Sequence, residues 1–113
     1  MITNRKLTAL ALALGFFAAG LTPSNAGYDE NRTGEITHIF TYPAGQIYIR
    51  LSNQPSSHPE CNPAYFAIDS TAPGKDAMYA RALAAFTAGQ PVNIGYDSQG
   101  NCASGQIRIH RVG

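Results

Sequence analysis

The hydrophobic pattern of this 113-residue chain changes period around one internal segment, and that change limits the folds it can adopt. Between residues 76 and 88 apolar side chains recur at helical spacing, whereas on both sides of this segment they alternate as in β-strands. We therefore expect one helix, over Asp76–Ala88, in an otherwise β-rich chain, with Asp76 capping its start and Gly89 ending it. The apolar stripe expected to face the core comprises Met78, Tyr79, Ala82, Leu83 and Phe86.

Five short segments carry strand signals. The clearest is Gln46–Ser52, in which Ile47, Ile49 and Leu51 share one face and are expected in the core. Asn53–Pro63 is expected to be a loop, because its prolines cannot donate hydrogen bonds to a strand ladder. The five predicted strands are Gly34–Thr41, Gln46–Ser52, Tyr65–Asp69, Pro91–Tyr96 and Gln106–Val112.

The resulting order, β-β-β-α-β-β, fits two β-rich α+β architectures. One is a small sandwich in which the helix covers one face of an open sheet. The other is a small five-stranded, partly open barrel of the OB type, with one helix between strands 3 and 4. A barrel hides strand edges that an open five-stranded sheet would expose, so we expect the OB-like barrel.

The first 26 residues have the features of a secretory signal peptide. Arg5 and Lys6 precede the apolar run Leu7–Leu21, and the small residues Ser24 and Ala26 precede a potential cleavage site. A membrane anchor is the alternative, but an apolar run of about 15 residues is shorter than the roughly 20 that a spanning helix needs. We expect a signal peptide at residues 1–26 and a single secreted or periplasmic domain at residues 27–113.

Cys61 and Cys102 are the two cysteines of the chain. In an exported protein they are expected to form a disulfide, since the compartment is oxidising. Two free buried thiols are the alternative, and a zinc site would need more ligands at closer spacing. A bridge closing a loop of about 40 residues would stabilise so small a domain by roughly 4 kcal/mol.

The charge balance argues against two classes of partner. The whole chain has a formal net charge of +1, and loss of Arg5 and Lys6 with the signal peptide leaves −1. This is unlike the basic surface of a nucleic-acid-binding protein, and there is no polybasic segment for an anionic membrane. We expect neither partner, and no membrane span after cleavage.

Catalytic patterns are weak. Ser98 lies in a turn that resembles a nucleophile elbow, but Tyr96 stands where that turn needs glycine. His38 and His110 would be neighbours able to hold a metal ion if the first and last strands paired; otherwise they are solvated strand histidines. We therefore expect a non-enzymatic domain without a metal or other cofactor.

Binding is the remaining function class. The expected outward faces of the strands carry aromatic and cationic side chains, and rings beside polar groups suit sugars, whose C–H faces stack on rings. OB barrels bind oligosaccharides or nucleic acid on the face of strands 2 and 3. The alternative is an ordinary surface on which Arg50 and Arg108 pair with Glu35 or Asp69. The candidate binding residues are Tyr48, Arg50, Tyr96, Arg108 and His110.

Several of these elements carry a family resemblance. Gly34, Ile36 and Ile39 open the first strand, and the helix end continues directly into the fourth strand through Thr87–Ile94. With the signal peptide, the alternating strand Ile47–Leu51 and two cysteines, the pattern resembles the small exported proteins grouped with the binding subunit of subtilase cytotoxin. The likeness covers about residues 34–112. It implies an OB-fold that forms a pentamer and binds cell-surface glycans, and it assigns no sugar-contacting residue.

These inferences predict an exported, non-enzymatic, single-bridge OB-like domain. It would bind a glycan or a partner protein and form a ring-shaped homo-oligomer. The alternative is a small periplasmic inhibitor or accessory protein that presents the loop Gln54–Pro63 to a partner enzyme.

Overall fold

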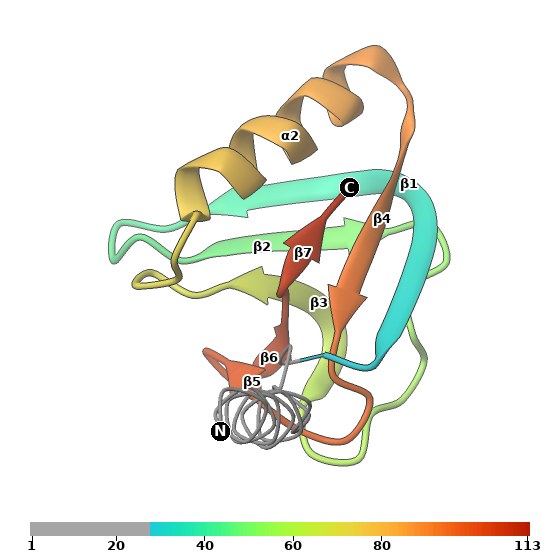
Figure 1. The fold of residues 1–113 in the computed structure, drawn as a ribbon, viewed down its shortest axis with the longest axis vertical. Coiled ribbons are helices and arrows are strands. Elements are labelled where there is room, and N and C mark those ends of the chain that lie inside the picture. Colours follow the sequence, from blue (N-terminus) through green and yellow to red (C-terminus); the bar gives the residue numbers. More distant parts are fainter. Residues whose placement is uncertain (1–27) are drawn as a thin grey trace, which may run out of the picture.

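The computed structural model describes residues 28–113 (Figure 1), so the predicted signal peptide lies outside the described residues. The described part is a β-rich α+β fold with one helix between its third and fourth strands, as predicted. The elements are β1 (Glu30–Thr41), β2 (Ile47–Leu51), β3 (Asn62–Ile68), α2 (Lys75–Ala88), β4 (Pro91–Tyr96), β5 (Cys102–Ala103), β6 (Gln106–Arg108) and β7 (Arg111–Val112).

All seven strands belong to one curled mixed sheet in the order β5-β6-β3-β2-β1-β4-β7 (Figure 1). Its pairs are antiparallel except β3 with β6, which run parallel. Two halves of β1 serve different neighbours: Glu30–Glu35 pairs with β4, and Ile36–Thr41 pairs with β2. A bulge between Ile36 and His38 separates the halves, and bulges bend a strand and increase its twist. β1 can therefore continue around the curled sheet.

The prediction of five strands is wrong, because the expected last strand is divided and a short extra strand precedes it. β6 pairs with β3 and β7 pairs with β4, which lie far apart in the sheet order. Between them, the backbone N–H of Ile109 donates to Ala67 of β3, and that of His110 donates to Gly95 of β4. One continuous segment thus changes partner from one side of the sheet to the other. The two-residue strand β5 pairs back on β6.

The helix α2 lies across one end of the curled sheet and contacts β1, β4 and β7 (Figure 1). Its start differs from the prediction: Gly74, in the left-handed region at φ 72°, occupies the N-cap position, and Asp76 lies in the first turn. The predicted end is confirmed. Gly89 has φ 66°, and its N–H donates to the Phe86 carbonyl.

The predicted apolar stripe of α2 is wrong at two of its five positions. Ala82 and Ala85 are buried, and Met78 and Tyr79 pack against the core from partly buried positions. Leu83 and Phe86 are 41% and 42% exposed. The small alanine side chains form the face that meets the sheet, so the larger apolar residues on the neighbouring face remain at the surface.

The core lies inside the curl, and the predicted inward face of β2 is confirmed. Ile47, Ile49 and Leu51 are all buried. They pack with Phe66 of β3 and with buried residues later in the chain, namely Val92, Ile94, Ile107 and Ile109. Within residues 28–113 there is no helix of the length and apolarity needed to cross a membrane.

The predicted disulfide is confirmed. Cys61 and Cys102 are bonded, with their Cα atoms 5.5 Å apart. The bridge joins the end of the loop before β3 to β5, two segments separated by 41 positions in the sequence. The backbone N–H of Asn62 also donates to the Gly105 carbonyl, so the connection is reinforced beside the bridge.

Candidate functional site

Aromatic side chains cover the outer surface of three neighbouring strands. They come from alternate positions, so they point away from the core that Ile49 and Phe66 occupy on the same strands. We call this surface the aromatic face; it consists of His38, Phe40, Tyr42, Tyr48, Arg50 and Tyr65.

The five rings of the aromatic face form one continuous series. The ring centroids of Tyr42 and Tyr48 are 4.9 Å apart, and those of Tyr48 and Tyr65 are 5.7 Å apart. Phe40 lies 5.5 Å from Tyr65, and His38 lies 5.7 Å from Phe40. These are the spacings of favourable tilted aromatic pairs. Each ring therefore packs against one or two neighbours in the series.

The rings of this series differ in how exposed they are and in whether a hydrogen bond holds them in place. Phe40 and Tyr42 are 38% and 41% exposed and are among the largest exposed apolar side chains of residues 28–113. Tyr48 is half-buried, and its hydroxyl donates to the Ser104 carbonyl at 3.3 Å. The surface thus combines two partly exposed rings with others that are more deeply buried.

Arg50 gives the aromatic face its cation. It lies opposite His38 in the β1–β2 register, and its guanidinium lies 5.9 Å from the centroid of the Tyr65 ring. One nitrogen donates to the Ala64 carbonyl at 2.7 Å. Among the described residues Arg50 forms no ion pair, so the alternative that it pairs with Glu35 or Asp69 is wrong for this arginine. Its remaining N–H groups can serve a ligand.

The structure does not bring the five predicted binding residues together. Tyr48 and Arg50 lie on the aromatic face, but Tyr96 is only 6% exposed and faces the core. Its ring packs against that of Phe66 at 5.1 Å, so its predicted place on a polar face is wrong. The physical reason is strand alternation, which puts Tyr96 on the same side as the buried Ile94.

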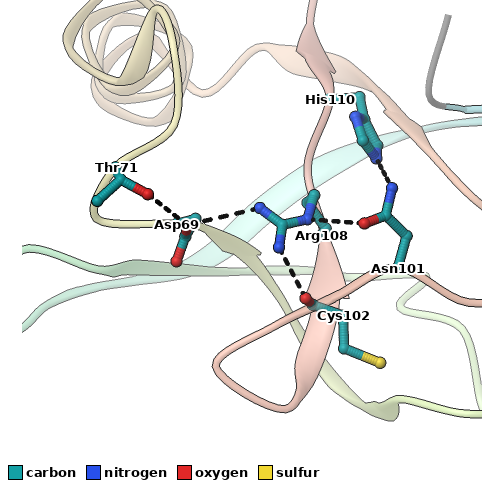
Figure 2. Close-up of polar contacts among 6 residues, drawn as sticks. All are labelled: Asp69, Thr71, Asn101, Cys102, Arg108 and His110. Carbon is teal, nitrogen blue, oxygen red and sulfur yellow. Dashed lines mark hydrogen bonds and ion pairs between the residues drawn. The ribbon is translucent and has the colours of Figure 1, made fainter.

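The other two predicted residues, Arg108 and His110, belong to a polar cluster at the break between β6 and β7 (Figure 2). Arg108 pairs with Asp69 at 3.7 Å, as one alternative predicted. Its Nε donates to Asn101 Oδ1 at 3.1 Å, and a terminal nitrogen donates to the Cys102 carbonyl at 2.9 Å. The Asn101 amide nitrogen lies 2.9 Å from Nε2 of His110.

The same cluster includes Thr71, whose hydroxyl donates to Asp69 Oδ2 at 2.8 Å. This bond, and next the positive charge of Arg108, lower the pKa of the Asp69 carboxyl. Asp69 is therefore an anion and balances the charge of Arg108.

Donor and acceptor roles in this cluster fix the state of His110. Arginine can only donate, so the Asn101 oxygen accepts from Arg108 and the Asn101 amide must donate to His110. Nε2 of His110 is then an acceptor, and the neutral ring carries its proton on Nδ1. In agreement, burial and next the charge of Arg108 lower the pKa of His110 below 6.5, although Asp97 opposes the shift.

A pH dependence follows from His110. Its folded pKa is lowered, so the unfolded chain binds the proton more tightly, and stability present above pH 6.5 is lost as pH falls through the folded value. We expect the urea midpoint of the wild type to fall more steeply between about pH 7 and pH 5 than that of His110→Phe. Identical slopes for the two proteins would contradict this role of His110.

The loop before β3 is held by its own side chains, and it ends at Cys61, because Asn62 and Pro63 of the predicted loop Gln54–Pro63 belong to β3. Gln54 accepts from the Leu51 N–H and donates to the Pro63 carbonyl, both at 3.0 Å. Nδ1 of His58 accepts from the Cys61 N–H at 3.0 Å, and its Nε2 donates to the Asp97 carbonyl at 2.8 Å. His58 is thus a structural residue that connects two loops.

The catalytic alternatives find no support in the geometry. His38 lies opposite Arg50, whereas His110 bonds to β4, so the two histidines are not paired. Ser98 bonds to the Asp29 carboxylate through both its N–H and its hydroxyl, at 2.8 and 2.9 Å. These bonds lower the pKa of Asp29. In the described part of the chain, no three His, Cys, Asp or Glu side chains are grouped as metal ligands.

Sequence reasoning did not select Phe40 or Tyr65, which complete the aromatic face. Their alternation with the buried Phe66 and the half-buried Ile39 was the available signal, but the bulge after Ile36 interrupts the pattern in β1.

Comparison with protein-family models, with curated proteins and with solved structures gave no match.

Proposed function

We propose that this chain is an exported, non-enzymatic domain with an OB-like barrel that binds a glycan on its aromatic face. The strand pairings support the barrel: β1 bends to pair with both β2 and β4, and the segment formed by β6 and β7 pairs with both β3 and β4. The helix between β3 and β4, at one end of the sheet, also agrees with an OB-like barrel.

The observation that carries the binding proposal is the continuous series of five rings on the outer surface of β1, β2 and β3. In OB barrels the face of strands 2 and 3 binds oligosaccharides or oligonucleotides. Tyr42 and Phe40 offer exposed rings for the C–H faces of a sugar, and Arg50 offers N–H donors for its hydroxyl groups.

A single-stranded nucleic acid also stacks on aromatic rings, but it requires a cationic groove for its phosphates. Arg50 is the one cation of the aromatic face, and Arg108 nearby is paired with Asp69. The charge therefore disfavours a polyanionic ligand such as a nucleic acid. Together with the resemblance to the binding subunits of subtilase cytotoxin, this supports a cell-surface glycan as ligand and a homo-oligomeric assembly.

The proposal predicts that Phe40→Ala/Tyr42→Ala reduces glycan affinity about tenfold, a loss of about 1.4 kcal/mol shared between the two ring contacts. The variant also loses the ring pairs of Phe40 with Tyr65 and of Tyr42 with Tyr48, so the melting temperature should fall moderately while the native spectrum is retained. The measurement is a glycan array followed by calorimetric titration of the best hit with wild type and variant.

Phe86→Ala is the matched control, because Phe86 is an equally exposed ring on α2, outside the aromatic face. It should bind like the wild type. The native mass of all three proteins must be determined, because a change in subunit number would alter avidity. A wild type without any array hit, or a double variant with unchanged affinity, would refute the proposal.

The loop Gln54–Pro63 supports a second candidate function, that of an inhibitor or accessory protein. Side-chain bonds of Gln54 and His58 hold the loop, and Ser56 and Ser57 remain exposed at its surface. A preordered loop loses little entropy on binding a partner enzyme. Capture of a partner from a periplasmic extract by a protein that binds no glycan would favour this function.

A further inference from the structure

A cavity of about 270 Å³ lies beside the polar cluster of Figure 2 and outside the aromatic face. It is formed where the loop before α2, the first turn of α2 and the break between β6 and β7 meet. Four of its lining side chains are apolar and two are polar. The lining residues are Ala72, Pro73, Met78, Ile109, Arg108 and His110.

The two polar lining residues retain donors for a ligand. Nδ1 of His110 carries the proton, because Nε2 accepts from Asn101. Nδ1 has no hydrogen-bond partner among residues 28–113, and Figure 2 shows it on the side of the ring away from Asn101. The Arg108 nitrogen nearest Asp69 is 3.7 Å from its carboxylate, beyond hydrogen-bond distance.

The two charged side chains of the polar cluster balance each other. Asp69 balances Arg108, and His110 is neutral. An anionic ligand on Arg108 would meet repulsion from Asp69, and a cationic ligand would meet donors only. A neutral acceptor group avoids both costs. Apolar walls with a few convergent polar groups and a histidine of perturbed pKa are typical of ligand sites.

We propose that this cavity binds a small uncharged acyl or amide group. Its carbonyl oxygen accepts from His110 Nδ1 and Arg108, and its short apolar chain lies against Met78 and Ile109. The volume is just below the roughly 300–1,000 Å³ of pockets for drug-sized ligands. The ligand is therefore a small molecule or the acylated end of a larger one. This site is independent of the proposed glycan site.

Butyramide is the probe, because it joins an uncharged carbonyl head to a short chain. In NMR titrations at about pH 7.5, where His110 is neutral, the methyl signals of Met78 and Ile109 should shift and saturate with a millimolar Kd. Butyrate has the same chain with an anionic head and should bind several-fold more weakly.

Variants separate the cavity from the aromatic face. His110→Phe keeps a ring but removes the donor and should weaken butyramide binding about tenfold. Ala72→Leu fills the cavity without changing a polar group and should abolish the shifts, which keeps the test valid if the first variant misfolds. Arg50→Gln, on the aromatic face, should leave butyramide binding unchanged.

Three results would overturn the proposal. They are shifts that fail to saturate, tighter binding of butyrate than of butyramide, and a correctly folded Ala72→Leu protein that still binds the probe. The spectrum of each variant before titration reports whether it is folded.

Discussion

The double variant Cys61→Ala/Cys102→Ala is expected to unfold about 4 kcal/mol more easily than the oxidised wild type. The bridge closes a loop across 41 sequence positions, so its loss releases a long segment of the unfolded chain. A domain of this size has a total stability of only about 5–15 kcal/mol. Urea denaturation of both proteins, fitted for the free energy of unfolding, measures the difference.

Reductant supplies the control. It should lower the midpoint of the wild type to that of the double variant and leave the variant unchanged. Near the bridge, the hydrogen bonds of His58 with the Asp97 carbonyl and of Asn62 with the Gly105 carbonyl do not involve the sulfur atoms, so we expect them to remain in the variant. The loss should therefore appear in stability, with a native-like spectrum retained in the absence of urea. Equal midpoints with and without reductant would disprove the stabilising role.

Local pattern was sufficient for much of the fold. The helix, its end at Gly89, the inward face of β2 and the disulfide were all predictable, because each depends on spacing, on one backbone conformation or on a cysteine pair. The division of the segment Gln106–Val112 into β6 and β7 was not predictable from the sequence. Ile109 and His110 donate to carbonyls of two different strands, and that change of partner depends on how the whole sheet curls.

The helix shows a second limit of sequence patterns. Leu83 and Phe86 fit a helical stripe, yet the buried face is that of Ala82 and Ala85. Hydrophobicity alone favours the larger side chains for the core. In the structure the small residues Ala82 and Ala85 face the sheet instead, because they allow the helix and the sheet to pack closely together.

The site was predictable in part. Tyr48 and Arg50 lie on the aromatic face, since strict alternation in β2 makes their orientation unambiguous. Phe40 and Tyr65 were missed because the bulge in β1 and the prolines before β3 obscure the alternation there. Tyr96 was misplaced although the alternation of Val92 and Ile94 already directs it inward.

Tyr96 leads to the second large effect. We expect Tyr96→Ala to lower the free energy of unfolding by roughly 3–5 kcal/mol, the usual cost of removing a buried ring. The ring packs against Phe66 in the core, and no nearby side chain can fill the space without moving. Phe66 loses its ring contact with Tyr96 in this variant, which contributes to the loss of stability. The free energy of unfolding is measured by chemical denaturation at equilibrium.

Tyr96→Phe separates the core role from a binding role. The Tyr96 hydroxyl makes no hydrogen bond to the described residues, so its removal should change stability by less than about 1 kcal/mol. If Tyr96 acts only in the core, Tyr96→Phe also binds glycan like the wild type. If its hydroxyl contacts a ligand, affinity falls while stability stays constant, and that pair of results would place the ligand near the end of β4, away from the aromatic face.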